Sequence, residues 1–107
     1  MAEDRVIKLT ADFFKTLGHP VRIKILHCLE HGELCVCDLL EEIGIEQSNL
    51  SQHLSMMKKQ GIIDSRKEGQ KVIYRIVYTS VMDVICAAEK TLSQQIGQSQ
   101  SILKFFK

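Results

Sequence analysis

The chain has 107 residues, of which 45% are hydrophobic and 25% are charged, and its formal net charge is +1. That length predicts a single domain over residues 1–107, with a core small enough that dimer formation is a common way of adding stability. The sequence contains no long apolar run and no signal-peptide pattern, which excludes a membrane-spanning protein and predicts a cytoplasmic location.

Five segments of the chain have apolar residues at helical spacing. Pro20 suits the first turn of a helix, where its missing N–H costs no hydrogen bond. Gly32, Gly44 and Gly61 suit the positions that follow helix ends. The predicted helices cover residues 4–16, 20–31, 35–43, 47–60 and 80–106.

The periodicity of the apolar residues changes to two after Gly61, which indicates β-strands. The predicted strands are residues 62–66 and 71–77, and Gly69 lies in the connection between them, as expected for a β-hairpin. Two helices at a tight turn followed by a hairpin form the element order of a winged helix-turn-helix. The expected fold is therefore mainly α, with five helices and a two-stranded wing, and the terminal helices forming a dimer layer.

Charge is distributed unevenly along the chain. Residues 26–46 contain six acidic side chains and no Lys or Arg, whereas residues 47–77 contain six basic side chains and two acidic ones. The helix over 47–60 carries Gln, Asn and Ser side chains that are able to read base edges in the major groove, and Lys and Arg at the hairpin suit DNA phosphates. The predicted DNA-contacting residues are Gln47, Ser48, Asn49, Ser51, Gln52, Ser55, Arg66, Lys67 and Lys71.

Two of the four cysteines, Cys35 and Cys37, lie one residue apart at the predicted start of the helix over 35–43. Cytosolic thiols stay mostly reduced, and the positive end of a helix favours the thiolate, which binds soft, thiophilic ions. Residues i and i+2 do not share a face of a regular helix, so both sulfurs reach one ion only if this first turn is loose or extended. An ion bound there would pull on the helix start and shift the population away from the DNA-competent form.

With these motifs in place, the chain resembles the ArsR/SmtB family of bacterial metal-responsive repressors over nearly its whole length. The strings that carry the resemblance are LGHPVRIKIL at 17–26, ELCVCDL at 33–39, QSNLSQHL at 47–54, KQGII at 59–63 and RKEGQKVIY at 66–74. The helix-turn-helix and wing strings are shared across the family. The CVC string is similar to the thiolate site of its arsenic and antimony sensors and of its cadmium and lead sensors.

The resemblance implies a homodimer, joined by its terminal helices, that leaves its operator when As(III)/Sb(III) or Cd(II)/Pb(II) binds Cys35 and Cys37. A symmetric dimer would place two recognition helices about 34–36 Å apart, or a multiple of that spacing, so the expected operator is an imperfect palindrome of double-stranded DNA. The third cysteine of the arsenic sensors is replaced here by Leu40, and no cysteine precedes Cys28. Cys28 and Cys86 are therefore the candidates for a third ligand, and no organic cofactor is expected.

Two other functions remain open at this point. Sulfide and redox sensors of the same family pair a cysteine of the second helix with one of the last helix, and Cys28 and Cys86 lie in those helices, with Cys28 shifted by one place. The alternative is thus a thiol-based redox or persulfide-sensing repressor that uses Cys28 and Cys86. A small dithiol oxidoreductase is a third possibility, but the C-x-x-C motif and βαβ unit of such enzymes are missing, so the chain is not expected to be an enzyme.

Overall fold

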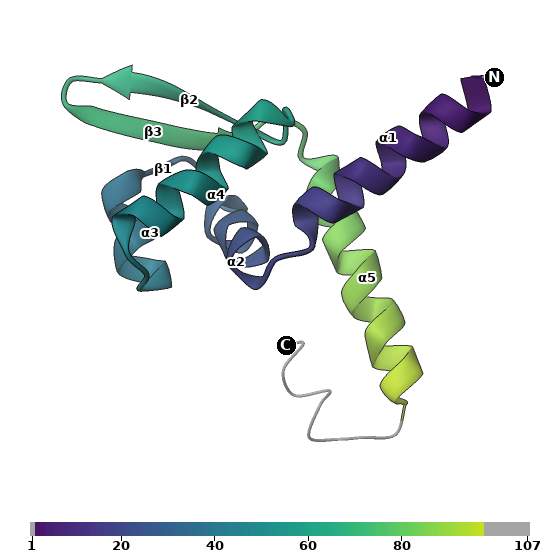
Figure 1. The fold of residues 1–107 in the computed structure, drawn as a ribbon. Helices are drawn as coiled ribbons and strands as arrows, with labels where there is room; N and C mark the ends of the chain where they lie inside the picture. Colours follow the sequence, from purple (N-terminus) through teal and green to yellow (C-terminus); the bar gives the residue numbers. More distant parts are fainter. Residues whose placement is uncertain (1, 98–107) are drawn as a thin grey trace.

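The computed structural model describes residues 2–97, which form five helices and one three-stranded antiparallel sheet (Figure 1). Every helix in this range is too short or too polar to span a bilayer. The helices are α1 (Ala2–Leu17), α2 (Pro20–Leu29), α3 (Val36–Ile43), α4 (Gln47–Lys59) and α5 (Ser80–Ile96). The strands are β1 (Leu34–Cys35), β2 (Ile63–Glu68) and β3 (Lys71–Ile76), and their order in the sheet is β1-β3-β2.

The predicted helices and hairpin are confirmed, with small differences at their ends. α2 begins at Pro20 as expected but ends at Leu29, two residues before the predicted end. The hairpin turn is tighter than predicted, because β2 continues to Glu68 and only two residues separate the strands. The part of the last helix that was predicted beyond residue 97 lies outside the described residues.

A tight turn joins α3 to α4 and makes the helix-turn-helix. Gly44 ends α3 with a left-handed φ of 74°, and its N–H donates to the carbonyl of Leu40 at 2.9 Å. Side chains with a Cβ rarely adopt this conformation, so glycine suits the position. Only Ile45 and Glu46 then precede α4, which begins at Gln47.

The core is built mainly by α2, α3, α4 and the start of β2, and Leu17 of α1 and Val81 and Ile85 of α5 complete it. Leu50, Leu54 and Met57 on α4 are fully buried, as the spacing i, i+4, i+7 predicted. The other fully buried large side chains are Ile25, Leu26, Leu39 and Ile63. Burial of one face of α4 leaves its opposite face free for another partner.

Helices α1 and α5 project away from this core on the side opposite the hairpin (Figure 1). Large apolar side chains on both helices remain exposed to solvent: Val6, Ile7, Leu9 and Phe14 on α1 and Leu92 on α5. An apolar hollow of about 400 Å³ lies between the two helices and the start of α2, with Leu17, Ile85 and Leu92 among its lining residues. Exposed apolar area of this extent is unusual for a small monomer and marks a surface that contacts a partner.

Strand β1 was not predicted from the sequence. Leu34 pairs with Tyr74, and Cys35 pairs with Ile73, so this two-residue strand is an edge of the wing sheet. Two residues are too few to show an alternating pattern, and only the hydrogen bonds offered by β3 define the strand. The wing is therefore attached through its own sheet to the residues that begin α3.

A buried arginine ties α4 to the end of α1. Arg22, only 9% exposed, donates from Nη1 to the carbonyl of Thr16 at 2.9 Å and from Nε to Nδ1 of His53 at 3.0 Å. The His19 ring lies beside the His53 ring, with 5.7 Å between ring centroids. Burial, and then the nearby Arg22 and His19, lower the pKa of His53, so the structure favours the neutral ring that is able to accept from Arg22.

We expect His53→Gln to reduce the pH dependence of stability. The pKa of His53 is lower in the folded protein than in the unfolded chain. The stability that neutral His53 contributes is therefore fully present above the ordinary histidine pKa of about 6.5, and it is lost as the pH falls through the lower folded pKa. Glutamine keeps an acceptor for Arg22 but does not titrate, so the melting temperature of the variant should fall less than that of the wild type between about pH 7 and about pH 5.

His53→Leu is the matched control for the hydrogen bond. It leaves the buried Nε–H of Arg22 without its partner, which costs about 1–3 kcal/mol relative to the wild type at a pH where His53 is neutral. An equally steep pH dependence in wild type and His53→Gln would show that His53 does not titrate as the structure indicates.

Candidate functional site

The polar face of α4 is fully available to solvent. All six side chains predicted to read DNA bases from this helix are exposed, while the apolar side chains between them are buried. The exposed residues are Gln47, Ser48, Asn49, Ser51, Gln52 and Ser55. They alternate with the core contacts of α4 at helical spacing, so the helix presents one continuous polar side of donors and acceptors.

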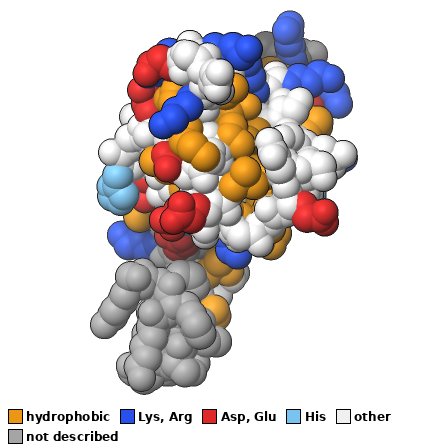
Figure 2. All heavy atoms as spheres, turned by 90° about the vertical axis from the view of Figure 1, so that its left-hand side faces the viewer, with side chains coloured by type: hydrophobic (Ala, Val, Ile, Leu, Met, Phe, Trp, Pro, Cys, Tyr) orange, Lys and Arg blue, Asp and Glu red, His pale blue; other side chains and the backbone are white. Residues whose placement is uncertain are grey.

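The wing provides cations beside this helix. Lys67 and Lys71 are exposed near the turn of the hairpin. Viewed from the hairpin side, Lys and Arg side chains gather in the upper part of the molecule, and acidic side chains lie mostly lower, with apolar side chains between them (Figure 2). The basic excess predicted from the sequence thus forms a basic region on the surface, which suits phosphate groups.

Arg66 differs from the two lysines because carboxylates already occupy its guanidinium group. Its two terminal nitrogens donate to both carboxylate oxygens of Glu33, at 2.7 and 2.8 Å. Glu68 accepts from Nε of the same side chain at 3.0 Å. The hydrogen bond from Arg66 lowers the pKa of Glu33, so this pair remains charged well into the acidic range.

Cys35 and Cys37 come together because only one of them is in the helix. Cys35 has an extended backbone, with φ −79° and ψ 164°, and is the N-cap of α3, whereas Cys37 is in its first turn. Their Cα atoms are 5.3 Å apart, and their sulfurs are joined in a disulfide. The spacing of the two cysteines required an extended first turn for both sulfurs to reach one ion, and Cys35 has that extended backbone.

Asp38 completes this cluster. One ligand atom from each of Cys35, Cys37 and Asp38 lies within 4.8 Å of the others. The Asp38 N–H donates to Sγ of Cys35 at 3.3 Å, and the Cys35 N–H donates to the carboxylate of Asp38 at 3.4 Å, which is a capping box. An acid three residues after an N-cap is the sequence signal of such a box, and it would have identified Asp38 as the nearby third donor.

The cluster adjoins the predicted DNA-contacting elements. Cys35 and Cys37 line a hollow of about 660 Å³ whose other walls include Gln47 and Ser51 of α4 and Lys71 of the wing. Cys35 is buried, whereas Cys37 and Asp38 are exposed. A ligand that reaches Cys37 from solvent would thus arrive beside both the recognition helix and the wing.

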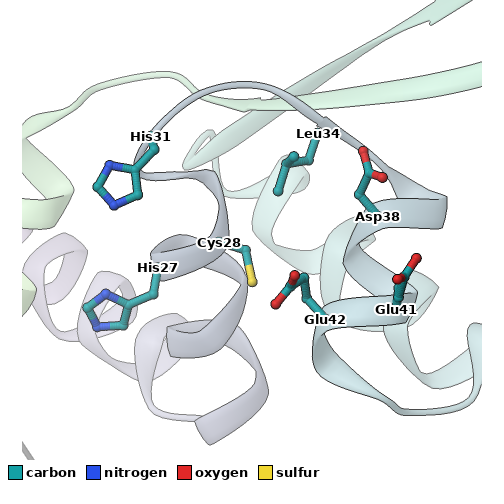
Figure 3. A pocket seen from close by; sticks show the side chains of 7 residues that line it. All are labelled: His27, Cys28, His31, Leu34, Asp38, Glu41 and Glu42. Atoms are coloured by element: carbon teal, nitrogen blue, oxygen red, sulfur yellow. The ribbon is translucent and has the colours of Figure 1, made fainter.

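Cys28 belongs to a different environment. Its side chain points from α2 into a pocket shared with α3, toward Glu42, with Asp38 and Glu41 on the far wall (Figure 3). Burial first, and then the charge of Glu42, raise the pKa of this thiol. Reactive cysteines are usually found in electropositive surroundings, so this acidic pocket favours the neutral thiol.

The structure leaves Cys28 and Cys86 as free cysteines. Cys86 is exposed on α5, and no residue of α5 lines the pocket that holds Cys28. His27 of α2 does contact Glu89 of α5, with 3.0 Å between Nε2 and the carboxylate oxygen, so the two helices lie side by side near these cysteines. Within residues 2–97, neither cysteine belongs to a group of three metal-ligating side chains.

Comparison with known proteins identifies the same unit. Residues 19–65, which include the helix-turn-helix and the thiol cluster, match the model of the family described as bacterial regulatory protein, arsR family. An uncharacterised HTH-type transcriptional regulator of Mycobacterium tuberculosis is 35% identical over 97% of this chain and 92% of its own length. Its crystal structure has a TM-score of 0.78 at 38% identity, covering 85% of this chain and 92% of that one.

Two further relatives bear on function and assembly. The cadmium resistance transcriptional regulatory protein CadC of Listeria innocua is 40% identical over 68% of this chain and 62% of its own length. A homodimeric winged helix-turn-helix DNA-binding domain of Mycobacterium bovis has a TM-score of 0.78, covering 92% of this chain and 91% of that one, but its 22% identity supports the fold alone. Fold, extent of match and identity together show that the chain belongs to the arsR family of bacterial regulatory proteins and is a DNA-binding transcriptional regulator rather than an enzyme.

Proposed function

We propose that this protein is a cytoplasmic homodimeric repressor that leaves an imperfect palindromic operator when a thiophilic metal or metalloid ion binds Cys35 and Cys37. The observation that carries this proposal is the cluster of two sulfurs and one carboxylate where the wing sheet meets the helix-turn-helix. Thiolates select soft ions over magnesium or calcium, and the reduced dithiol is the form that would ligate.

The exposed apolar faces of α1 and α5 support the homodimer. A second copy would cover Val6, Ile7 and Phe14, which are more than half exposed in a single chain. The similar domain of Mycobacterium bovis is homodimeric, which agrees with this assignment. A two-fold axis through these helices would present two copies of α4 to successive turns of one DNA duplex.

Each part of the polar and basic surface has a distinct role in the proposed complex. The side chains of α4 enter the major groove, where Gln52 and Asn49 have the amide groups that pair with adenine. Lys67 and Lys71 contact phosphates, which adds affinity without sequence preference. Arg66 was predicted to contact phosphate as well, but its carboxylate partners occupy the same donors.

Ligand binding would act on DNA through Cys35. This residue is the last residue of β1 and the cap of α3, so movement of its sulfur changes both the wing edge and the first helix of the DNA-binding unit. An ion that binds the altered arrangement more tightly shifts the protein toward it. A coupling of about 1–3 kcal/mol would reduce operator affinity by about 5–150-fold.

The donor set supports As(III)/Sb(III) or Cd(II)/Pb(II) as the inducing ion. After reduction, two thiolates and the Asp38 carboxylate would provide three donors. Asp38 would then be the third ligand, for which the sequence had indicated Cys28 or Cys86. The similarity to a cadmium resistance regulator favours the same class of ions. Magnesium and calcium prefer all-oxygen sites and do not suit this set.

Two substitutions separate base reading from phosphate binding. Lys71→Gln should weaken binding to every DNA sequence and reduce the slope of log affinity against log salt by about 0.9 for each phosphate that is no longer neutralised. Gln52→Ala should instead relax the preference for one operator base, by about 1–3 kcal/mol, with the slope unchanged. Fluorescence anisotropy across a salt series measures both effects.

Lys90→Gln is the matched control, because Lys90 is an exposed lysine on α5, a helix that runs away from the hairpin (Figure 1). It should leave both affinity and salt dependence at wild-type values. An equal decrease of the slope in the Lys71 and Lys90 variants would contradict the placement of phosphate binding on the wing.

The proposed sensor is tested by the double variant Cys35→Ser with Cys37→Ser. Serine keeps the size of the side chain and its capacity to cap α3, but it removes the soft ligands, so operator binding should persist while release by arsenite or cadmium is abolished. A gel-shift titration under reducing conditions measures this. If the double variant leaves the operator at the ion concentration that releases the wild type, Cys35 and Cys37 are not the sensory ligands.

Cys28→Ser and Cys86→Ser serve as matched single variants in the same titration. We expect both to retain the wild-type response, because the acidic pocket raises the pKa of Cys28 and neither cysteine belongs to the described group of metal-ligating side chains. If Cys28→Ser and Cys86→Ser each abolish release by persulfide, and the Cys35→Ser with Cys37→Ser protein is still released by persulfide, the redox-sensing alternative is correct.

A further inference from the structure

One ion pair reaches from the far strand of the wing to the residue that precedes β1. Arg66 is on β2 and Glu33 directly precedes β1, so the guanidinium group crosses the middle strand β3 to reach the carboxylate. The contact is a fork, with two nearly equal hydrogen bonds of 2.7 and 2.8 Å. Forked pairs of this type fix the orientation of both groups as well as their distance.

The register of the sheet places this fork beside the thiol site. Ile73 of β3 pairs with Arg66 on one side and with Cys35 on the other, so the three residues form one row across the sheet. Neighbouring residues in such a row point to the same face. Glu33 lies two residues before Cys35 in the chain, so the carboxylate held by Arg66 belongs to the segment that leads directly into the thiol site.

Strand β1 needs such an additional attachment because it is short. It has two residues and, within residues 2–97, pairs with β3 alone and has no strand on its other edge. Few backbone hydrogen bonds hold a strand of this length, and an edge strand is easily displaced. The fork fixes the chain immediately before β1 to the opposite edge of the wing.

We infer that Glu33 and Arg66 are positioning residues that transmit the state of the thiol site to the wing. This inference rests on the proposed function, since it concerns how an ion at Cys35 and Cys37 changes DNA binding. With the fork intact, displacement of Cys35 moves Glu33 and draws β2 and the wing with it. With the fork broken, β1 moves alone and the wing keeps its place on the DNA.

The test compares Glu33→Gln, Arg66→Gln and the double variant with the wild type, using arsenite and cadmium chloride as probes. The quantity measured is the release ratio, defined as the operator dissociation constant with the ion divided by that without it. Each single variant should bind the ion as the wild type does, and its release ratio should be reduced by about two- to fivefold. The double variant should show no larger reduction than either single variant, because both substitutions remove one interaction.

Asp64→Asn is the matched control. Asp64 forms an ion pair with Arg75 at 3.7 Å that joins β2 to β3, whereas Arg75 acts on Glu33 only through its charge and makes no fork with it. Its removal should leave the release ratio unchanged. If surface ion pairs acted only by stabilising the fold, the Asp64 and Glu33 variants would change alike in melting temperature and in release ratio. Both quantities are therefore measured for both variants.

Three outcomes would overturn the inference. A wild-type release ratio in Glu33→Gln would show that the fork transmits nothing. A reduction of the salt slope by about 0.9 in Arg66→Gln would show that Arg66 leaves Glu33 to bind a phosphate. If the ions release the Cys35→Ser with Cys37→Ser protein from the operator, the proposed function is disproved as well. If that protein does not respond and either of the first two results is found, only this inference is disproved.

Discussion

The backbone pairing of Cys35 with Ile73 connects the thiol cluster to the wing of the DNA-binding domain. It holds Cys35 in an extended conformation, and an extended residue at the start of α3 brings its sulfur beside that of Cys37. The same residue caps α3 through the N–H of Asp38, so one side chain is both a potential ligand and a helix cap. If Cys35 were inside the helix instead, the two sulfurs would point to different sides.

Electrostatics explains why one pair of cysteines suits a sensor better than the other. The acidic residues of α3 line the pocket of Cys28 and raise the pKa of its thiol together with burial. Cys35 and Cys37 lie at the N-terminal end of the same helix, where the helix dipole favours negative charge. One short helix thus raises the pKa of the Cys28 thiol on its acidic side and carries the disulfide of Cys35 and Cys37 at its start.

The shape of the molecule follows from the small size of its core. The core takes only the end of α1 and the start of α5, and the rest of both helices extends beyond it with large apolar residues in solvent (Figure 1). Burial of that surface in a dimer would contribute stability that a domain of this length cannot obtain alone. Arg22 connects this region to the recognition helix, since it joins the last turn of α1 to His53 of α4. One buried side chain therefore links the orientation of α1 to that of the exposed polar face of α4.

The amino-acid sequence by itself determined the helices, the hairpin and the identity of the polar face of α4, because each of these depends on local periodicity and on Gly or Pro at the ends of elements. It also predicted the spacing of Cys35 and Cys37 and the need for an irregular helix start. The tertiary structure alone decided how that start is achieved, since β1 exists only through its hydrogen bonds to β3, a strand that follows two helices later in the chain. Similarly, the assignment of Arg66 to Glu33 and the proximity of Asp38 to both sulfurs depend on the positions of side chains across strands and around a helix cap. Periodicity describes which face a residue occupies, but only packing determines which partner it meets there.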